Sequence, residues 1–389
     1  MDLKFGSIPE EWESTTLGGV CGRITTGKLD ANAMVADGDF PFFTCARENY
    51  WIDKYAFDYE ALLVSGNGAN VGYVHYYDGK FNAYQRTYVI SEFSADVQFL
   101  KLFLERNLHE RIRVEVNAGN TPYITMGTLT EMEVVLPRSR DEQRAIATAL
   151  SDMDGLLGGL DRLIAKKRDL KQAAMQQLLT GQTRLPGFHG EWEVKRLRDL
   201  FEITSSKRVF QSEWKSEGIP FYRARELAVL GETGQVDNEL FITKSLYDSF
   251  RTAYGVPEVG DMLVTGVGTL GKVYVVRDEE EFYFKDGNII WFKIRGAVSA
   301  EFLRQLYLTK VVMKQIIDGS AGTTVGTYTI SGAKKTEIPF PPLPEQTAIA
   351  AVLTEMDGEL ARLEQRREKT RALKQAMMQE LLTGRTRLV

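Results

Sequence analysis

The 389-residue sequence is poor in cysteine and histidine, with two cysteines and three histidines. The cysteines, Cys21 and Cys45, are too few for a disulfide framework, and no spacing typical of metal ligands is present. The chain also lacks the run of about 18 apolar residues that a membrane-spanning helix requires. Its first residues carry an early aspartate and no apolar stretch typical of a signal peptide. We therefore expect a cytoplasmic protein with no bound metal and no membrane contact.

An excess of positive charge is also missing. The formal net charge is −5, with 13 basic and 20 acidic residues in the segment 1–141 and 21 of each in the segment 182–344. Proteins that bind DNA mainly through its phosphates are usually basic. Any contact with DNA must therefore come from local patches, or a partner must neutralise many of the phosphates.

Recognisable catalytic motifs are absent as well. The sequence has no Gly-x-Ser-x-Gly motif, no Asn-Pro-Pro-Tyr motif of amino-methyltransferases and no Pro-Cys nucleophile of cytosine methyltransferases. Residues 266–271 fit the dinucleotide-binding glycine pattern, but a strand rather than the required helix is expected after them. Val273 also replaces the Ser or Thr that holds magnesium in a P-loop. We interpret this segment, like residues 66–72, as a strand–turn–strand hairpin, and expect no catalytic residue or cofactor on the chain.

The main positive feature is a long internal repeat. Residues 142–185 align without a gap on residues 345–388, at an offset of 203, with 26 identities in 44 positions. A Glu-Trp-Glu sequence also occurs twice, at 11–13 and 191–193. The repeat predicts four segments: a first domain at 1–141, a helix at 142–181, a second domain at 182–344 and a second helix at 345–389.

Apolar residues in both repeats recur in alternating steps of four and three, which is the heptad pattern of a coiled coil. Pro344 is typical of the first turn of a helix, and Gly181 and Gly384 are typical of helix ends. Each helix would contain about 38 residues and be about 57 Å long. Because a helix with one apolar stripe needs a partner, we expect the two to pack antiparallel through Ile146, Leu150, Met153, Leu157, Leu160, Ile349, Leu353, Met356, Leu360 and Leu363.

The two domains combine strand and helix patterns. Strands are predicted at 73–77, 87–90, 134–136, 273–276 and 289–294, and amphipathic helices at 96–116 and 300–317. The expected fold class is therefore α+β, with two globular mixed α/β domains separated by two long antiparallel coiled-coil helices and related by a pseudo-twofold axis.

Together these features resemble the specificity subunit of type I restriction–modification systems, and the resemblance covers the whole chain. It rests on Leu-Pro-Glu-Gln at 343–346, on the Leu-Lys-Gln-Ala and Leu-Leu-Thr-Gly blocks of both repeats, and on Glu-Trp-Glu before each domain. One departure occurs before the first helix, where residues 136–143 lack the proline-rich entry present at 339–344.

The resemblance implies that both domains are target-recognition domains, each recognising one half of a split site in double-stranded DNA. The helices would set the gap between the halves and dock two modification (methyltransferase) subunits. Those subunits would bind S-adenosylmethionine and methylate adenine, and restriction (endonuclease) subunits would join the complex. This chain would be non-catalytic and carry no cofactor, and its partners would supply much of the phosphate contact.

Candidates for DNA contact are polar or basic residues in predicted loops at matching places of both halves. Arginine pairs well with guanine, and asparagine or glutamine with adenine. The candidates in the first domain are Lys28, Arg47, Asn49, Asn67, Asn70, Gln85, Arg86, Asn120 and Tyr123. Those in the second domain are Lys207, Arg208, Arg223, Arg225, Lys272, Lys285, Asn288, Thr323 and Tyr328.

Two other functions fit parts of the sequence. A coiled-coil scaffold that joins proteins without contacting DNA would need the repeated helices alone. A nucleotide-binding enzyme would use the glycine-rich residues 266–271. Binding of random duplexes in the presence of partner subunits distinguishes DNA recognition from the scaffold, and nucleotide binding by the chain alone would favour the enzyme.

Overall fold

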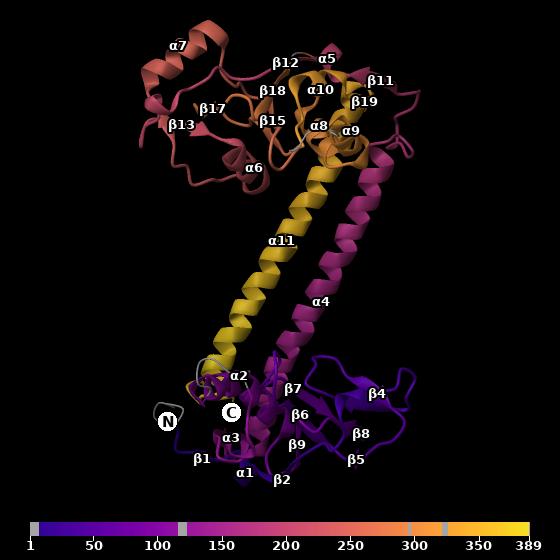
Figure 1. The fold of residues 1–389 in the computed structure, drawn as a ribbon, viewed down its shortest axis with the longest axis vertical. Helices are drawn as coiled ribbons and strands as arrows, with labels where there is room; N and C mark the ends of the chain where they lie inside the picture. The colour runs from indigo at the N-terminus through magenta and orange to yellow at the C-terminus, as the bar shows by residue number, and fades with distance from the viewer. Residues whose placement is uncertain (1–7, 116–122, 295, 297, 321–325, 389) are drawn as a thin grey trace. The chain divides into compact units, whose positions relative to one another are not determined.

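The computed structural model describes residues 8–115, 123–294, 296, 298–320 and 326–388. The chain forms two compact units, of which unit 1 comprises Met1–Arg162 and Gln365–Val389 and unit 2 comprises Leu163–Glu364. The unit boundaries fall inside two long helices, α4 (Arg140–Leu178) and α11 (Leu343–Leu381) (Figure 1). Each unit therefore contains one globular domain together with part of both long helices.

The globular part of unit 1, called domain 1 below, precedes α4. Its helices are α1 (Leu17–Val20), α2 (Val97–Glu115) and α3 (Met126–Thr130), and a 3₁₀ turn lies at Ala31–Ala33. Its strands are β1 (Trp12–Thr16), β2 (Cys21–Thr26), β3 (Phe40–Phe43), β4 (Tyr50–Ile52), β5 (Phe57–Asp58), β6 (Ala61–Ser65), β7 (Val74–Tyr77), β8 (Lys80–Ala83), β9 (Thr87–Phe93) and β10 (Glu133–Pro137).

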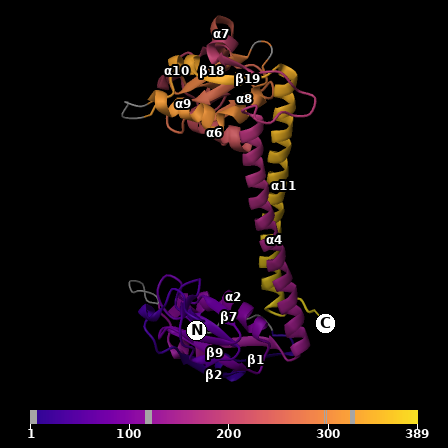
Figure 2. The same ribbon diagram turned by 90° about the vertical axis from the view of Figure 1, so that its right-hand side faces the viewer.

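Domain 1 contains two four-stranded sheets. The sheet with strand order β2-β9-β6-β7 is antiparallel, whereas the sheet with order β4-β3-β8-β5 contains the parallel pair β3 and β8. Strands β1 and β10 form a separate antiparallel ribbon. In both ribbon views α2 lies along β7 (Figures 1 and 2), so this helix covers the antiparallel sheet.

The alternating side chains of β6 place the antiparallel sheet between two apolar cores, as the period of two in a strand requires. Leu62 and Val64 belong to a core that includes Phe103 of α2. Leu63 belongs to the core on the other face, which includes Phe81 of the second sheet. The domain therefore has three layers: a helix, the antiparallel sheet and the smaller mixed sheet.

The globular part of unit 2, called domain 2, lies in sequence between α4 and α11. Its helices are α5 (Leu197–Leu200), α6 (Ala224–Thr233), α7 (Lys244–Tyr254), α8 (Ala300–Tyr307), α9 (Lys310–Ser320) and α10 (Ile330–Lys335), with a 3₁₀ turn at Gln211–Glu213. Its strands are β11 (Glu193–Arg196), β12 (Phe201–Thr204), β13 (Ile219–Tyr222), β14 (Phe241–Ile242), β15 (Met262–Thr265), β16 (Val273–Val275), β17 (Tyr283–Phe284), β18 (Ile289–Ile294) and β19 (Glu337–Phe340).

Domain 2 repeats the layers of domain 1. Its antiparallel sheet has the order β12-β18-β15-β16, its mixed sheet has the order β14-β13-β17 with β13 and β17 parallel, and β11 pairs with β19. Met262 and Val264 of β15 pack in a core with Phe302 of α8, whereas Leu263 packs on the other face with Phe284. The same alternation therefore builds both domains.

The predicted strands correspond to β7, β9, β10, β16 and β18, and the predicted helix at 96–116 corresponds to α2. The single helix predicted at 300–317 was wrong, because α8 ends at Tyr307 and α9 begins at Lys310. The amides of Leu308 and Thr309 donate to carbonyls three residues earlier, at 3.1 and 2.9 Å. This tighter turn interrupts the helix although the apolar periodicity continues across it.

Helices α4 and α11 run antiparallel within both units. A series of ion pairs joins the two helices, and along this series the residue number falls in α11 as it rises in α4. The pairs also follow the repeat: adding 203 to Asp154 and subtracting 203 from Lys374 gives the pair Asp357–Lys171. These pairs range from exposed to partly buried, and an exposed pair such as Arg168–Glu364 contributes about 0–1 kcal/mol. The pairs are Asp154–Lys374 (2.6 Å) and Asp161–Arg367 (3.4 Å) in unit 1, and Lys167–Glu359 (2.7 Å), Arg168–Glu364 (2.5 Å) and Lys171–Asp357 in unit 2. The predicted fold class, two mixed α/β domains with two long antiparallel helices, is confirmed.

The ten apolar residues predicted to pack the two helices together, called seam residues below, differ in burial along the helices. Ile146 and Leu150 are fully buried in the core of domain 1, and Ile349 and Leu353 are buried in the core of domain 2. Each helix start is therefore anchored in the domain that precedes it in sequence. Of the other seam positions, Leu160 is buried and those that are half-buried are Met153, Leu157, Met356, Leu360 and Leu363.

The end of each long helix completes the core of the domain where the other helix begins. Leu381 and Leu382 lie in the core of domain 1, and Leu178 and Leu179 lie in the core of domain 2. Helix α11 ends at Leu381, close to the helix end predicted at Gly384, and Leu382 after it packs in the core of domain 1. The last residues of the sequence are thus a structural part of the first domain.

Leu382→Ala is expected to destabilise domain 1 selectively, by about 2–5 kcal/mol, because a fully buried side chain leaves a cavity. Hydrogen exchange of β6 and β15 measures the two domains separately, and exchange should accelerate in β6 alone. Leu179→Ala should show the reverse pattern, and Leu388→Ala, at a side chain that is 39% exposed, should change neither strand. Equal acceleration in both strands after Leu382→Ala would contradict this organisation.

Candidate nucleic-acid interface

Five loops of domain 1, here called loop cluster 1, are joined by hydrogen bonds. The cluster comprises residues 27–30, 44–49, 66–73, 84–87 and 123–125, and it contains every first-domain candidate that the structure describes. The connecting bonds, from donor to acceptor, are Gly66 to Arg86 (2.8 Å), Ile124 to Gly66 (2.9 Å), Gln85 to Leu29 (2.9 Å) and the side chain of Asn70 to Cys45 (3.0 Å). Residues far apart in the sequence are therefore brought into one polar surface.

The basic side chains of loop cluster 1 are available for a ligand. Lys28 and Arg86 are exposed, and neither side chain forms a hydrogen bond or ion pair within the described part of the chain. Arg47 lies over the ring of Tyr73, with 5.8 Å between guanidinium and ring centroid. A cation above an aromatic face keeps its N–H groups free for acceptors. Tyr123 is 57% exposed.

The amide side chains of loop cluster 1 are partly engaged. Asn49 donates to the carbonyl of Tyr50 (3.2 Å) and Gln85 donates to Asp30 (3.4 Å). Asn67 pairs through its backbone with Tyr123, and its side chain is unbonded among the residues described. Each amide has four hydrogen-bonding positions, so capacity for a base edge remains.

An equivalent set of loops in domain 2 forms loop cluster 2. It comprises residues 205–208, 222–225, 266–272, 285–288 and 327–329, which lie next to the corresponding strands and helix. The bonds, from donor to acceptor, are Gly266 to Asn288 (2.8 Å), Tyr328 to Gly266 (2.8 Å), Lys285 to Tyr222 (2.9 Å) and the amide of Lys207 to the hydroxyl of Tyr283 (2.9 Å). The two domains thus present the same backbone arrangement with different side chains.

A glycine at the centre of each cluster explains why the loops lie so close together. A Cβ on Gly66 would lie 2.2 Å from the carbonyl oxygen of Arg86, and a Cβ on Gly266 would lie 2.5 Å from that of Tyr328. Both contacts are far below van der Waals distance, so only glycine allows the loops to approach. The glycine-rich segments are therefore strand connections, as the predicted hairpins required, and β6–β7 and β15–β16 pair antiparallel.

Several basic candidates in domain 2 are neutralised by neighbouring carboxylates. Arg208 pairs with Asp286 (2.9 Å), Arg223 pairs with Glu226 (2.6 Å), and Lys272 pairs with Glu232. A phosphate or base would have to compete with these carboxylates. We therefore rank these three side chains below the unpaired ones as candidates.

Other polar residues of loop cluster 2 are unpaired. Arg225 is exposed, and within the described ranges its side chain, like those of Lys285 and Asn288, forms no hydrogen bond or ion pair. The ammonium group of Lys207 lies 4.5 Å from the ring centroid of Tyr254. Arg225 and Lys285 are accordingly the strongest cationic candidates in this domain.

One candidate has to be withdrawn, and two lie outside the described residues. Tyr328 is only 5% exposed, and its hydroxyl is bonded to those of Tyr307 (3.2 Å) and Thr336 (2.9 Å). Its ring belongs to the core of domain 2, so the prediction that it contacts DNA was wrong. Asn120 and Thr323 lie outside the described residues.

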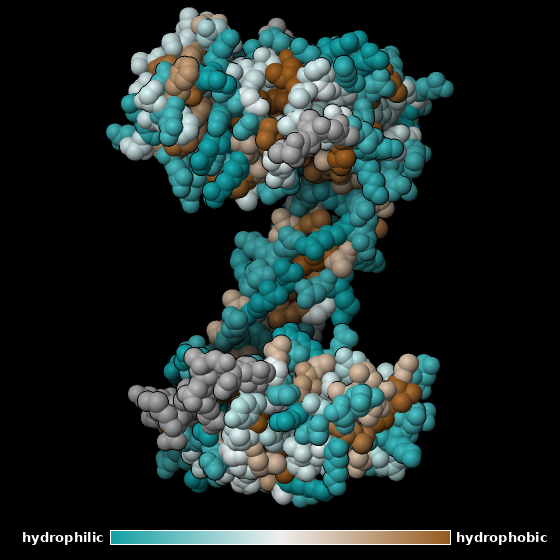
Figure 3. Space-filling model, in the orientation of Figure 1, coloured by the Kyte–Doolittle hydropathy of each residue, from teal (hydrophilic) through white to brown (hydrophobic). Residues whose placement is uncertain are grey.

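Exposed aromatic residues beside loop cluster 1 were missed in the sequence. Tyr50, Trp51 and Tyr55 are 42%, 45% and 45% exposed. Figure 3 also shows hydrophobic residues of other types at the surface in the region of β4. Strand β4 has only three residues, which is too short for a recognisable alternation. A surface position could therefore not be inferred for these rings.

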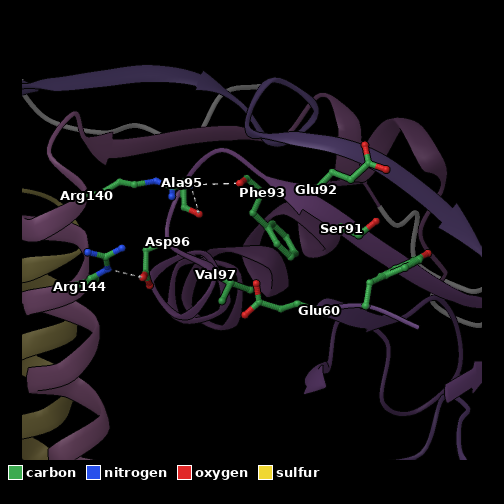
Figure 4. Close-up of a pocket in the computed structure, with 10 residues that line it drawn as sticks. Glu60, Ser91, Glu92, Phe93, Ala95, Asp96, Val97, Arg140 and Arg144 are labelled. Carbon is green, nitrogen blue, oxygen red and sulfur yellow. Dashed lines mark hydrogen bonds and ion pairs between the residues drawn. The ribbon is translucent and has the colours of Figure 1, made fainter. Parts of the chain in front are cut away.

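Charged side chains also gather at a cavity in unit 1. Within the described residues, no group of three or more His, Cys, Asp or Glu side chains could hold a metal ion. None of the helices in this part of the chain combines the length and the apolar character of a membrane span. The cavity, of about 600 Å³, lies between domain 1 and the start of α4 and is lined by Glu60, Glu92, Asp96, Arg140 and Arg144. The guanidinium of Arg140 donates to the backbone carbonyls of Ser94 and Phe93 (Figure 4). Because its N–H groups are engaged in this way, Arg140 is better suited to a structural role than to catalysis.

Comparison with known proteins gives a family match over most of the chain. The family model described as type I restriction modification DNA specificity domain matches twice, at residues 9–164 and 189–371. Both matches include one globular domain and part of the long helix that follows it. The repeat found in the sequence is therefore a repeat of this family's domain.

Relatives resemble the chain over nearly its whole length. The type I restriction enzyme EcoDI specificity subunit of Escherichia coli is 29% identical over 383 residues, covering 89% of this chain and 81% of that protein. The MjaVIII specificity subunit of Methanocaldococcus jannaschii is 23% identical over 410 residues, covering 98% and 94%. A crystal structure of a type I S subunit from M. genitalium has a TM-score of 0.61 at 20% identity and covers 98% of this chain and 99% of that one, which supports the same fold.

His75 is expected to make loop cluster 1 sensitive to acid. Its Nε2 lies 2.9 Å from the carbonyl of Ala46, and its ring packs against Phe43 and Tyr73. Burial lowers the pKa of His75 below its ordinary value, the Ala46 carbonyl opposes this, and Lys101 adds to the lowering. The unfolded chain therefore binds more protons below about pH 6.5, so stability falls as the pH decreases through this range.

Hydrogen exchange of residues 44–49 is therefore expected to gain an extra acceleration between pH 7 and pH 5, after correction for the intrinsic pH dependence. His75→Gln, which keeps a side-chain donor for Ala46 but cannot take up a proton, should remove this acceleration. The same acceleration in the glutamine variant would show that another group is responsible.

Proposed function

Because the chain belongs to the family of type I restriction–modification DNA specificity subunits, we propose that each loop cluster recognises one half of a two-part DNA sequence. Specificity subunits are the non-catalytic components of these complexes, so the chain is not an enzyme. The observation that carries the proposal is the duplicated loop cluster, in which the backbone bonds of Gly66 and Gly266 correspond while the exposed side chains differ.

The proposed recognition mode is hydrogen bonding to base edges from loops held by a rigid sheet edge. Arg86 and Arg225 are the leading candidates for guanine, because two parallel N–H groups match its O6 and N7 acceptors. Asn67 and Asn288 have unengaged amides suited to adenine. Lys28 and Lys285 are proposed to contact phosphates, which position a protein on the duplex without specifying sequence.

The proposal extends to the partners. We propose that α4 and α11 set the gap between the two half-sites and dock two modification subunits, which would bind S-adenosylmethionine and methylate adenine. Restriction subunits would join the same complex. The net charge of −7 in residues 1–141, from 13 basic and 20 acidic residues, fits an assembly in which these partners supply much of the phosphate contact.

Arg86→Ala and Arg225→Ala are each expected to change a different half of the recognised sequence. Losing a bidentate arginine–guanine contact costs about 1–3 kcal/mol and relaxes recognition at that position. Methylome sequencing of cells that express each variant with its modification subunit measures the recognised motif directly. Arg208→Ala is the matched control, since this side chain is already paired with Asp286, and should have a smaller effect. A change in both halves from either single variant would contradict separate recognition.

A second prediction concerns the gap. Inserting four helical residues after Arg162 and after Glu364 lengthens both helices at the unit boundaries by about 6 Å. Since successive base pairs are about 3.4 Å apart, the methylated motif should keep both half-sites and gain one or two base pairs between them. The same insertion in α4 alone would shift α4 out of register with its ion-pair partners on α11, so DNA methylation should be abolished. An unchanged gap after the double insertion would disprove the role of the helices.

A further inference from the structure

Both long helices begin with a buried glutamate and a buried glutamine. Glu142 is 1% exposed and Gln143 is 3% exposed, while Glu345 and Gln346 are both 0% exposed. Polar side chains at such burial have to be satisfied by hydrogen bonds or charges. We call Glu142, Gln143 and Arg387 junction 1, and Glu345, Gln346 and Arg184 junction 2.

The glutamine of each junction joins its helix to the globular domain. The side-chain oxygen of Gln143 accepts the amide of Asp96, just before α2 (2.7 Å), and its nitrogen donates to the carbonyl of Pro137 at the end of β10 (2.7 Å). One side chain thereby connects three elements of unit 1. Unit 2 repeats both bonds through Gln346, Ser299 and Pro341, at 2.9 and 2.7 Å.

The glutamate of junction 1 joins its helix to the end of the other helix. Arg387, in the segment that follows α11, donates from Nε and Nη2 to the two carboxylate oxygens of Glu142, the Nη2 bond being 2.8 Å. Its Nη1 donates to Glu11 (2.7 Å), just before β1. The guanidinium therefore connects the domain, the start of α4 and the chain end.

Junction 2 has the same design. Arg184, in the segment that follows α4, donates from Nη2 to Glu345 (2.6 Å), and Trp192 donates from its indole nitrogen to the same carboxylate (3.1 Å). The guanidinium also lies over the ring of Trp192 at 5.3 Å. Arg184 and Arg387 are separated by the repeat offset of 203 residues, as are Glu142 and Glu345, so the two junctions are equivalent.

Two arginines beside junction 1 add contacts between the start of α4 and domain 1. Figure 4 shows Arg140 directed at the backbone beside Ala95, and its guanidinium donates to the carbonyls of Ser94 (3.0 Å) and Phe93 (3.2 Å). Arg144 lies 3.8 Å from the carboxylate of Asp96. Both arginines come from the first turns of α4, so the helix start is held against the domain on a second side.

From this geometry we infer that junctions 1 and 2 are positioning sites that fix the orientation of each loop cluster on the helix pair, and thereby determine which gap length is accepted in DNA. The inference rests on the proposed function. Each added base pair moves a half-site by about 3.4 Å and rotates it by about 35°, so discrimination between gaps requires a fixed domain orientation. A bidentate arginine–carboxylate pair has the directionality for this, whereas a point charge does not.

The test replaces the two arginines by lysine. The double variant Arg184→Lys with Arg387→Lys keeps both positive charges beside the buried carboxylates but loses the bidentate geometry. The matched control is Arg168→Lys with Arg367→Lys, which alters interhelical pairs of the same chemistry away from the domains. Each protein is assembled with the modification subunit, and methylation is measured on duplexes whose gap differs from the best one by up to two base pairs.

The preference for the best gap over gaps one base pair shorter or longer is expected to fall about tenfold in the junction variant, which corresponds to about 1.4 kcal/mol. Methylation at the best gap should persist, and the control should keep the wild-type profile. An unchanged profile in the junction variant, or an equal broadening in the control, would overturn the inference. A wild-type complex without any gap preference would instead refute the proposed function.

Should the lysine variant fail to fold, Glu11→Gln provides a milder change. It removes the negative charge of an acceptor whose side chain is 67% exposed and leaves the pair between Arg387 and Glu142 in place. Because only junction 1 is altered, the preference for the best gap should fall by less than in the double lysine variant. A profile identical to that of the wild type would overturn the inference for junction 1.

Discussion

A carboxylate removed from water needs a cation beside it, because an unpaired buried charge costs several kcal/mol. Glu142 and Glu345 meet this requirement with arginines supplied by the segment after the opposite helix. Neither helix can therefore begin in its observed place unless the other helix ends at the same place. The register of the long helices, the attachment of both domains and the closure of both cores all depend on this pairing.

The loop clusters show how a fixed frame can carry different chemistry. The bonds made by Gly66 and Gly266 use only backbone atoms, so they are independent of the side chains on the surrounding loops. Arg86 and Asn288 supply the carbonyl acceptors of these bonds while their side chains remain unengaged among the described residues. Under the proposed function, substitution of such side chains would alter the recognised sequence without disturbing the backbone bonds that hold the loops.

The parts of this structure that repeat regularly could be predicted from the sequence, and those that depend on distant contacts could not. The heptad pattern from Ile146 to Leu160 predicted α4, and the glycines predicted the hairpins. The periodicity of apolar residues contains no information about polar partners, so the roles of Gln143 and Arg387 were not foreseen. Tyr328 was misplaced because a tyrosine next to a glycine-rich loop has the same local sequence whether its ring points outwards or into the core.

Unit 2 is one continuous stretch of chain, whereas unit 1 is completed only by residues 365–389. During synthesis on the ribosome, domain 1 emerges before domain 2, but its core lacks Leu381 and Leu382 until the end of α11 is translated. Domain 2 emerges later and already has Leu178 and Leu179 in place, because they precede it. Domain 1 is thus begun before domain 2 but completed after it, and apolar surface left uncovered in that interval favours aggregation.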